Sequence, residues 1–350
     1  MIDDIRLQHF RSYEDASFEF GPGVNIIVGP NGSGKTNLLE AIQIITIGKS
    51  YRVQDTELLQ FEAPWFRLDA HLDSGAQSRV IKFVTTARQT KSYELNDKPY
   101  RSLKLEQTVP TVLFEPNHLF LFQGSPDLRR NYLDDILEQI TPGFEGFRKQ
   151  YRRVLRQRNA LLKRGAVSER ELFPWNLRLS ELGAVIARER QRLVQLFDGE
   201  LAALYGLISH GKKHVRMTYE MRFPAETYET HLLHKLESSL EHDIARGFTA
   251  YGPHREDIAL LFDEHPAAEV ASRGEVRTAV LALKILELKQ LEEARGATPI
   301  LLLDDVFSEL DGTRRRALTT YLQKYQTFLT TTDADVVVKH FTDSTIIPLT

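Results

Sequence analysis

The chain has 350 residues, of which 42% are hydrophobic and 27% charged, and this ordinary globular composition excludes disorder over most of the length. It contains no cysteine, which excludes disulfides and thiolate metal sites, and its formal net charge of −3 excludes a basic surface spread over the whole chain. No apolar run is long enough to span a membrane and no signal-peptide pattern opens the chain, so we expect a cytoplasmic protein of about two domains.

The first segment alternates in the manner of a strand, and residues 24–28 are typical of a short buried strand. A glycine-rich turn follows, and after it Leu38, Leu39, Ile42 and Ile45 recur at helical spacing. The order strand, glycine turn, helix is the opening of an α/β unit.

The turn, Gly29-Pro30-Asn31-Gly32-Ser33-Gly34-Lys35-Thr36, fits the phosphate-loop pattern G-x-x-x-x-G-K-[ST]. Its glycines allow backbone N–H groups to converge on a phosphate, and the following helix adds the positive end of its dipole. We expect all eight residues to bind ATP, with Lys35 at the β- and γ-phosphates and the Thr36 hydroxyl on Mg²⁺. The alternative, a chance match by a glycine-rich turn, is disfavoured by the strand before it and the helix after it.

Residues 65–114 are expected to form short strands and hairpins. Helical patterns dominate from about residue 126 to about 245, with an expected break at Pro174 and a short strand over Val215–Met221.

The stretch Phe147–Arg164 is rich in Arg and Lys and contains no acidic residue. Apolar residues recur within it at helical spacing, so it predicts a helix whose basic face could neutralise DNA phosphates. A solvated helix paired to acids elsewhere is the alternative, and the sequence leaves both open. The candidate DNA contacts are Arg148, Lys149, Arg152, Arg153 and Arg156.

After residue 250 strands return, with one predicted over Asp257–Phe262 and a long amphipathic helix over Gly274–Glu293. Ser272 is a good N-cap for this helix, and Glu275 would complete a capping box. A second interpretation makes the same helix N-terminus a phosphate-binding end for a nucleotide held elsewhere, and the two interpretations are compatible.

The apolar strand Ile300–Leu303 ends in two acids, Asp304 and Asp305. A strand buried on both faces would place Asp304 at the carboxyl edge of a parallel sheet, where Mg²⁺ would bind. Asp305, one step further, could hold or deprotonate an attacking water. Asp311 would cap the next helix.

These elements predict the α/β fold class. We expect an ATP-binding head domain formed from both chain ends, residues 1–122 plus 246–350, with a mostly helical domain inserted over 123–245. Insertion is favoured because the phosphate loop needs an acidic strand end, which the sequence offers only near residue 304. Three domains in series is the alternative.

Together the motifs resemble the ABC-type ATPase head, and specifically the RecF family. Three runs carry the specific resemblance: P-x-x-R-R-x-x-L-D at 126–134, Q-R-N-x-L-L at 157–162 and G-P-H-R at 252–255. Glu256 stands where the family has the first of two aspartates. The resemblance covers essentially the whole chain.

The resemblance implies a head like that of SMC proteins without their long coiled coils. It implies ATP and Mg²⁺ as cofactors and an ATP-dependent homodimer in which Ser272 and Gly274 of one subunit contact the γ-phosphate bound by the other. It also implies a D-loop role for Asp311 and makes Gln123 the candidate Q-loop residue.

The resemblance further implies binding to single- and double-stranded DNA, especially gapped junctions. The expected setting is recombinational repair, replication restart and the response to DNA damage (the SOS response), at the nucleoid. RecR and RecO are the implied mediator partners in loading recombinase.

Some residues depart from the general ABC pattern. Glu275 replaces the usual Gln, and its carboxylate would repel a γ-phosphate; Asp305 stands where many ABC ATPases have Glu. We therefore expect a weak, DNA-stimulated ATPase that acts as a switch. The nucleotide-binding subunit of a membrane transporter and a non-catalytic scaffold are the alternatives.

Overall fold

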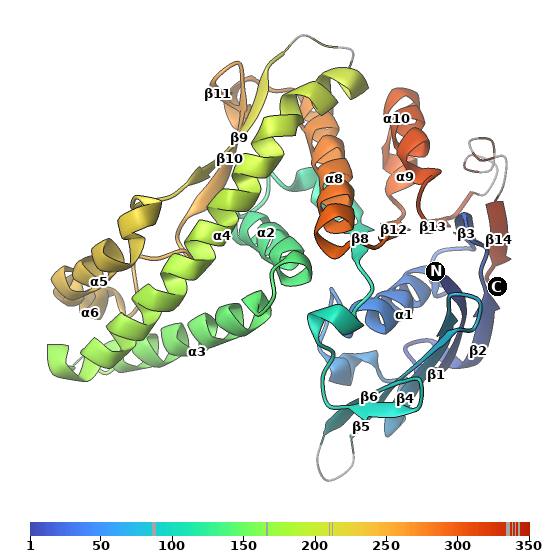
Figure 1. Ribbon diagram of the computed structural model, residues 1–350, viewed down its shortest axis with the longest axis horizontal. Coiled ribbons are helices and arrows are strands. Elements are labelled where there is room, and N and C mark those ends of the chain that lie inside the picture. The colour runs from blue at the N-terminus through green and yellow to red at the C-terminus, as the bar shows by residue number, and fades with distance from the viewer. Residues whose placement is uncertain are drawn as a thin grey trace. The chain divides into compact units, whose positions relative to one another are not determined.

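The computed structural model describes residues 1–85, 89–165, 167–209, 211, 213–333, 337, 339, 341 and 344–350 (Figure 1). Its contacts divide the chain into two compact units. The first unit comprises Met1–Leu119 and Glu287–Thr350, so both ends of the chain contribute to it, and the second comprises Phe120–Leu286.

Two sheets form the framework of the first unit in its described part. The antiparallel sheet has the order β2-β1-β4-β5-β6-β7. Its strands are β1 (Ile2–Phe10), β2 (Tyr13–Glu19), β4 (Trp65–Leu72), β5 (Gln77–Val84), β6 (Thr90–Leu95) and β7 (Lys98–Tyr100). The second sheet is parallel and has the order β14-β3-β13-β12-β8. Its strands are β3 (Val24–Val28), β8 (Thr111–Phe114), β12 (Ile300–Asp304), β13 (Thr327–Thr331) and β14 (Ser344–Pro348).

Helix α1 (Lys35–Ile47) is almost entirely buried and packs against strands of both sheets. Its leucines and isoleucines share one hydrophobic core with residues of β1, β4 and β5 and with residues of β12 and β13. Because this helix has no solvated face, the start of α1 is fixed firmly relative to both sheets. The remaining elements of the unit are η1 (Asp55–Leu58), η2 (Leu105–Gln107), α9 (Val306–Glu309) and α10 (Gly312–Leu322).

The second unit is mostly helical, with a small three-stranded sheet of order β11-β10-β9. Its long helices are α2 (Pro126–Ile140), α3 (Phe144–Leu162) and α4 (Glu169–Ser209). The other elements are β9 (Val215–Glu220), η4 (Ala225–Thr227), α5 (Tyr228–Ser238), α6 (Leu240–Arg246), β10 (Asp257–Phe262), β11 (His265–Pro266) and α7 (Ala267–Val270). Two elements, η3 (Pro116–Phe120) and α8 (Arg273–Arg295), span the boundaries between the units.

The α/β fold class and the strands predicted at Val24–Val28, Trp65–Leu72 and Asp257–Phe262 are confirmed. The contacts place the second boundary after Leu286, further along than the predicted residue 245, because β10 pairs with β9.

The break expected at Pro174 is wrong, because α4 runs through this residue. A capping box fixes the start of the helix: the Ser168 N–H donates to Glu171 Oε2 at 2.9 Å and the Glu171 N–H donates to Ser168 Oγ at 3.3 Å. Pro174 lies in the second turn, so it removes one helical N–H donor near an end that is already anchored.

Among the described residues, no helix combines the length and apolar character that a membrane-crossing segment needs.

Candidate nucleotide-binding site

The predicted phosphate loop lies in the first unit, between the end of β3 and the start of α1. Gly32 and Gly34 have φ angles of 87° and 96°, in the left-handed region that glycine adopts without strain. The Lys35 ammonium is buried and donates to the carbonyl oxygens of Gly29 at 2.7 Å and Pro30 at 2.8 Å. The backbone of the loop therefore fixes the position of the Lys35 ammonium.

Two further features of the loop bear on whether it could hold a phosphate group. The Ser33 hydroxyl oxygen is buried and has no hydrogen-bond partner among the described residues, so it is a free polar group within the loop. A Cβ at Gly34 would lie 2.8 Å from the Tyr13 hydroxyl, which donates to the Gly34 carbonyl oxygen at 3.1 Å. The first turn of α1 adds N–H groups and the positive end of the helix dipole.

Asp304 reaches the phosphate loop from the far end of the sequence. It lies at the carboxyl end of β12, where its Oδ1 accepts a hydrogen bond from Thr36 Oγ1 at 3.0 Å, across 268 positions. In the sheet register Asp304 pairs with Thr330 of β13, and Thr330 pairs with Ile27 of β3. The carboxyl ends of three neighbouring parallel strands thus bring acid and loop together.

The Thr36 hydroxyl and the Asp304 carboxylate are the hard oxygen ligands that Mg²⁺ prefers. No cluster of three or more His, Asp or Glu side chains that could hold a metal ion occurs in the described part of the chain. Two protein oxygens leave most positions of an octahedral shell to phosphate and water. This donor set fits an ion that binds together with a nucleotide.

Asp305 is exposed and has a φ of 54°, which is uncommon for a residue other than glycine. Its N–H donates to Thr330 Oγ1 at 2.8 Å, and its Oδ1 accepts from Ser308 Oγ at 3.1 Å. The same Thr330 hydroxyl donates to Asp304 Oδ1 at 2.8 Å. Thr330 therefore fixes the relative positions of the two acids while the Asp305 carboxylate stays accessible to water.

Sequence reasoning missed Thr330 and Tyr51. The Tyr51 hydroxyl donates to Asp304 Oδ2 at 3.4 Å, and burial, together with the Asp304 charge, raises the pKa of this phenol far above its usual value. Tyr51 is therefore a permanent hydrogen-bond donor to the acid. Thr330 could have been predicted as the residue in register with Asp304. Tyr51 could not, because it follows α1 in a segment with no periodic pattern.

Two predicted helix caps are confirmed. Asp311 Oδ1 accepts from the Arg314 N–H at 3.0 Å at the start of α10. The Ser272 N–H donates to Glu275 Oε2 at 2.8 Å, and the Glu275 N–H donates to Ser272 Oγ at 3.2 Å. Glu275 also pairs with Lys213 at 2.7 Å, and its hydrogen bonds to Lys213 and Ser272 lower its pKa. Glu275 is an ionised cap, as the sequence predicts.

The other predicted nucleotide contacts lie in the second unit. Ser272 and Gly274 open α8, and Gln123 is an exposed residue in the turn before α2. The roles of these three residues at a γ-phosphate, and the D-loop role of Asp311, stay predictions.

The predicted basic face of α3 needs one correction. Arg148 is buried and forms ion pairs with Asp134, Asp135 and Glu138, all within 3.0 Å, so it is not available to DNA. It serves instead as a link to α2. Of the five predicted DNA contacts, the structure exposes Lys149, Arg152, Arg153 and Arg156.

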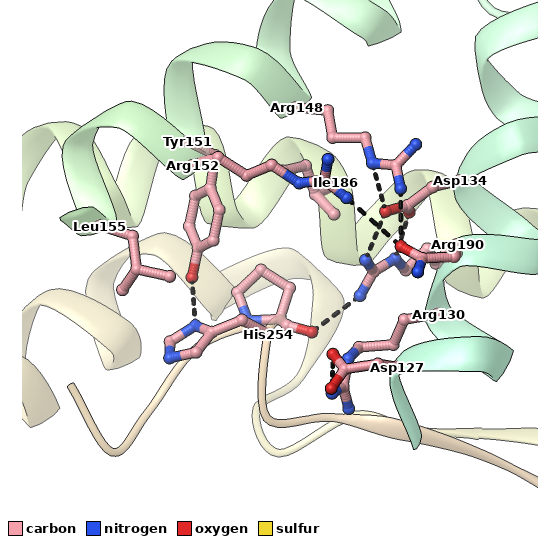
Figure 2. A pocket seen from close by; sticks show the side chains of 12 residues that line it. Asp127, Arg130, Asp134, Arg148, Tyr151, Arg152, Leu155, Ile186, Arg190 and His254 are labelled. Carbon is pink, nitrogen blue, oxygen red and sulfur yellow. Dashed lines mark hydrogen bonds and ion pairs between the residues drawn. The ribbon is translucent and has the colours of Figure 1, made fainter. Parts of the chain in front are cut away.

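The three sequence runs at 126–134, 157–162 and 252–257 lie together in the second unit. Arg190 of α4 forms two hydrogen bonds with Asp134, at 2.7 and 2.9 Å, and donates to the Pro253 carbonyl oxygen at 2.7 Å (Figure 2). Tyr151 Oη lies 2.7 Å from His254 Nδ1. These groups line a pocket of about 90 Å³.

The run at 157–162 has a structural role. Arg158 is fully buried, with its guanidinium 2.7 Å from Asp243 and 2.8 Å from the Thr249 hydroxyl. Asn159 Oδ1 accepts from the Thr249 N–H at 2.8 Å. A buried guanidinium is tolerated only when paired in this way, so the run fixes α3 against the α6 region.

Comparison with known proteins supports one family. The family model described as RecF/RecN/SMC N terminal domain matches residues 1–346. The protein "DNA replication and repair protein RecF" of Heliobacterium modesticaldum is 36% identical over 343 residues, covering 95% of this chain and 92% of the relative. The relative of the same name from Halalkalibacterium halodurans is 35% identical and covers 95% and 93%.

A solved structure titled "Structure of the recombination mediator protein RecF-ATPrS in RecFOR pathway" superposes with a TM-score of 0.86 at 30% identity, covering 95% of this chain and 92% of that chain.

Proposed function

The chain belongs to the RecF family of DNA replication and repair proteins, within the RecF/RecN/SMC N-terminal domain family, and from that premise we propose that it is an ATP-dependent DNA-binding protein with weak, DNA-stimulated ATPase activity. The transporter alternative loses its support, because the relatives match over 95% of this chain; a non-catalytic scaffold stays the alternative that an ATPase assay tests. A solved relative that carries RecF-ATP in its title, at 30% identity, supports ATP as the nucleotide.

ATP would bind along the loop from Gly29 to Thr36, with the Lys35 ammonium at the β- and γ-phosphates. Thr36 and Asp304 would hold Mg²⁺, which when bound would neutralise charge on the phosphate oxygens. Asp305 would orient or deprotonate the attacking water, because its carboxylate is exposed and accepts from Ser308 Oγ, while its backbone N–H is held by Thr330.

Two copies of the chain would sandwich two ATP molecules. Ser272 and Gly274 of one subunit would contact the γ-phosphate bound at Lys35 of the other, with Gln123 and Asp311 completing the site. The N-terminus of α8 supports this role, because the dipole of a long helix favours an anion there and Lys213 pairs with the ionised Glu275, which offsets the repulsion of its carboxylate.

The dimer would clamp DNA at gaps between single and double strands, and slow hydrolysis would release it. Four cationic side chains exposed on α3 support a phosphate contact: Lys149, Arg152, Arg153 and Arg156. RecR and RecO would be the mediator partners in loading recombinase at the nucleoid, and the RecFOR pathway named for the solved relative supports this setting.

The single observation that carries the proposal is the hydrogen bond from Thr36 to Asp304. A glycine turn that matched the motif by chance would not be expected to lie next to the acidic end of a buried strand 268 positions away. A nucleotide site needs Thr36 and Asp304 to lie close together, because the protein ligands of Mg²⁺ come from both the phosphate loop and the end of β12.

The proposal of shared sites is tested by mixing two inactive variants. Ser272→Arg puts a bulky cation where the partner's γ-phosphate would lie, while leaving the phosphate loop intact, and Lys35→Ala damages the loop while leaving Ser272 intact. Each variant alone is expected to lack ATPase activity, and a mixture should recover part of it, because one composite site has both intact halves. Absence of recovery in a mixture that forms heterodimers would contradict shared sites.

A capping-only role for Ser272 predicts a different result for the single variant. Loss of an N-cap costs about 0.5–2 kcal/mol of stability. Ser272→Arg would then be less stable but would still hydrolyse ATP, which a melting curve and an ATPase assay together distinguish.

A further inference from the structure

Strand β5 carries a buried arginine without an acidic partner. Alternate residues of β5 face the core, and Arg79 shares that face with Ile81 and Phe83, with only 6% of its surface exposed. Its one recorded hydrogen bond goes from Nη1 to the Ile45 carbonyl oxygen at 3.4 Å, and its Nε has no partner among the described residues.

Other buried arginines of this chain are paired with carboxylates. Arg148, Arg158 and Arg190 each lie within 2.9 Å of a carboxylate oxygen. For Arg79 no ion pair occurs in the described part of the chain. Burial lowers the pKa of its guanidinium, and the charge of Asp73 offsets this only in part. A buried charge without a directly paired counter-ion is costly, so Arg79 can be stabilised by an anion that binds at hydrogen-bond distance.

Arg79 lines a polar pocket of about 300 Å³ at one end of the antiparallel sheet, where the turns between β4 and β5 and between β6 and β7 lie. This volume is at the lower end of the range for small-molecule sites. Lys98 and the Tyr100 hydroxyl also line the pocket, and neither has a recorded partner in the described ranges. The pocket thus contains two cations and a hydroxyl donor.

Two amide side chains add donors. Asn96 Oδ1 accepts from the Ser78 N–H at 2.7 Å, and Gln107 Oε1 accepts from the Lys104 N–H at 2.8 Å. Because both amide oxygens are occupied, the NH₂ groups of Asn96 and Gln107 remain to donate. The one carboxylate of the lining, Glu106, is exposed, so it can accept a hydrogen bond from a hydroxyl group of a ligand.

We propose that this pocket binds a small hydroxylated phosphate monoester, such as a nucleoside monophosphate or a sugar phosphate, with the phosphate at Arg79 and Lys98 and a hydroxyl at Glu106. A phosphate monoester carries close to two negative charges and three terminal oxygens, which matches two cations and several donors. A carboxylate, with one charge and two oxygens, would leave donors unused. The site lies apart from the phosphate loop in sequence, so it does not depend on the proposed ATPase function.

The test uses the full chain with Lys35→Ala, so that binding at the phosphate loop is weakened. Ribose 5-phosphate, deoxyadenosine monophosphate and inorganic phosphate are titrated at constant ionic strength by calorimetry. We expect saturable binding of at least one monoester, tighter than that of inorganic phosphate. Adding Arg79→Gln or Lys98→Gln should weaken it roughly tenfold to a hundredfold, because each removes a charge-assisted hydrogen bond.

Arg79→Gln alone would not be decisive, because a buried arginine near the carboxyl end of α1 also supports that helix. Lys98 is exposed, so Lys98→Gln should fold normally and still lose affinity. Arg101→Gln is the matched control, because Arg101 is an exposed cation near Lys98 that does not line the pocket, and this variant should bind as the parent does.

Absence of saturable binding, or binding unaffected by Lys98→Gln, would overturn the proposal and leave Arg79 as a support for α1. Binding of acetate or of an acidic peptide with the same affinity as the monoesters would contradict the assignment of a phosphate monoester as the ligand. A 5′-phosphorylated oligonucleotide that binds more tightly than the same oligonucleotide without its phosphate, with the difference lost in Lys98→Gln, would identify a DNA end as the source of the phosphate; no such difference would identify a free small molecule.

Discussion

His254 is expected to make the stability of the second unit depend on pH. Its Nε2 lies 3.1 Å from the Thr249 carbonyl oxygen and therefore carries the proton, and its Nδ1 accepts from the Tyr151 hydroxyl at 2.7 Å. Burial, together with the charges of Arg255, Arg130 and Arg190, lowers the pKa of this imidazole from 6.5 to about 4, although the hydrogen bond to Thr249 acts in the opposite direction. The folded protein therefore holds His254 neutral.

The direction of the effect follows from proton linkage. The unfolded chain binds a proton at His254 more readily than the folded protein, because the folded pKa is the lower of the two. The stabilising contribution is complete above about pH 6.5 and is lost as the pH falls towards 4. A shift from 6.5 to about 4 corresponds to about 3 kcal/mol in full, of which about 2 kcal/mol is lost at pH 5.

The assay needs a signal from the second unit alone. The chain has two tryptophans, Trp65 in β4 and Trp175 in α4, so Trp65→Phe leaves Trp175 as the reporter. Urea unfolding is measured at pH 8 and pH 5, with and without His254→Gln. The stability advantage of His254 over Gln should shrink by about 2 kcal/mol between the two pH values. An advantage that is the same at both pH values would refute the reasoning, whatever the absolute stability of the variant.

Three predictions concern the nucleotide site. Lys35→Ala removes a charge-assisted contact worth about 1.5–3 kcal/mol, so ATP affinity measured by calorimetry should fall roughly tenfold to a hundredfold; unchanged affinity would contradict the loop assignment. Asp304→Asn should impair Mg·ATP binding, whereas Asp305→Asn should keep binding and lose hydrolysis, and normal turnover in both variants would make the strand-end interpretation wrong. Tyr51→Phe removes a long hydrogen bond to Asp304, worth about 1 kcal/mol, so Mg·ATP affinity should fall roughly fivefold; an unaltered Mg²⁺ dependence would assign Tyr51 to packing alone.

Patterns with a strong local cause were predictable from the sequence. The apolar runs at Val24–Val28 and Ile300–Leu303 have the composition of strands buried on both faces, and both form in the parallel sheet. The capping box of Ser272 and Glu275 was also predictable, because it depends only on residues three apart.

Arg148 shows where such reasoning fails. Its place in a run of basic residues suggested a solvated face, but the side chain points to three acids of α2, which a chain-order pattern cannot reveal. Arg79 is the opposite case: the alternation of β5 places a cation on the core face, but which groups surround it depends on the ends of other strands.

The register of the parallel sheet explains why the sequence alone could predict that Asp304 lies beside the phosphate loop. Parallel pairing aligns Asp304 with Thr330 and Thr330 with Ile27. The three residues therefore lie side by side across the sheet, and Ile27 comes two residues before Gly29, where the phosphate loop begins. Any residue at the carboxyl end of β13 must then lie between the two acids and the loop, whatever its identity. A hydroxyl at this position donates to one acid and accepts from the N–H of the other. Thr330 is therefore the residue through which a change at the metal-binding acid would reach the acid proposed to act on water.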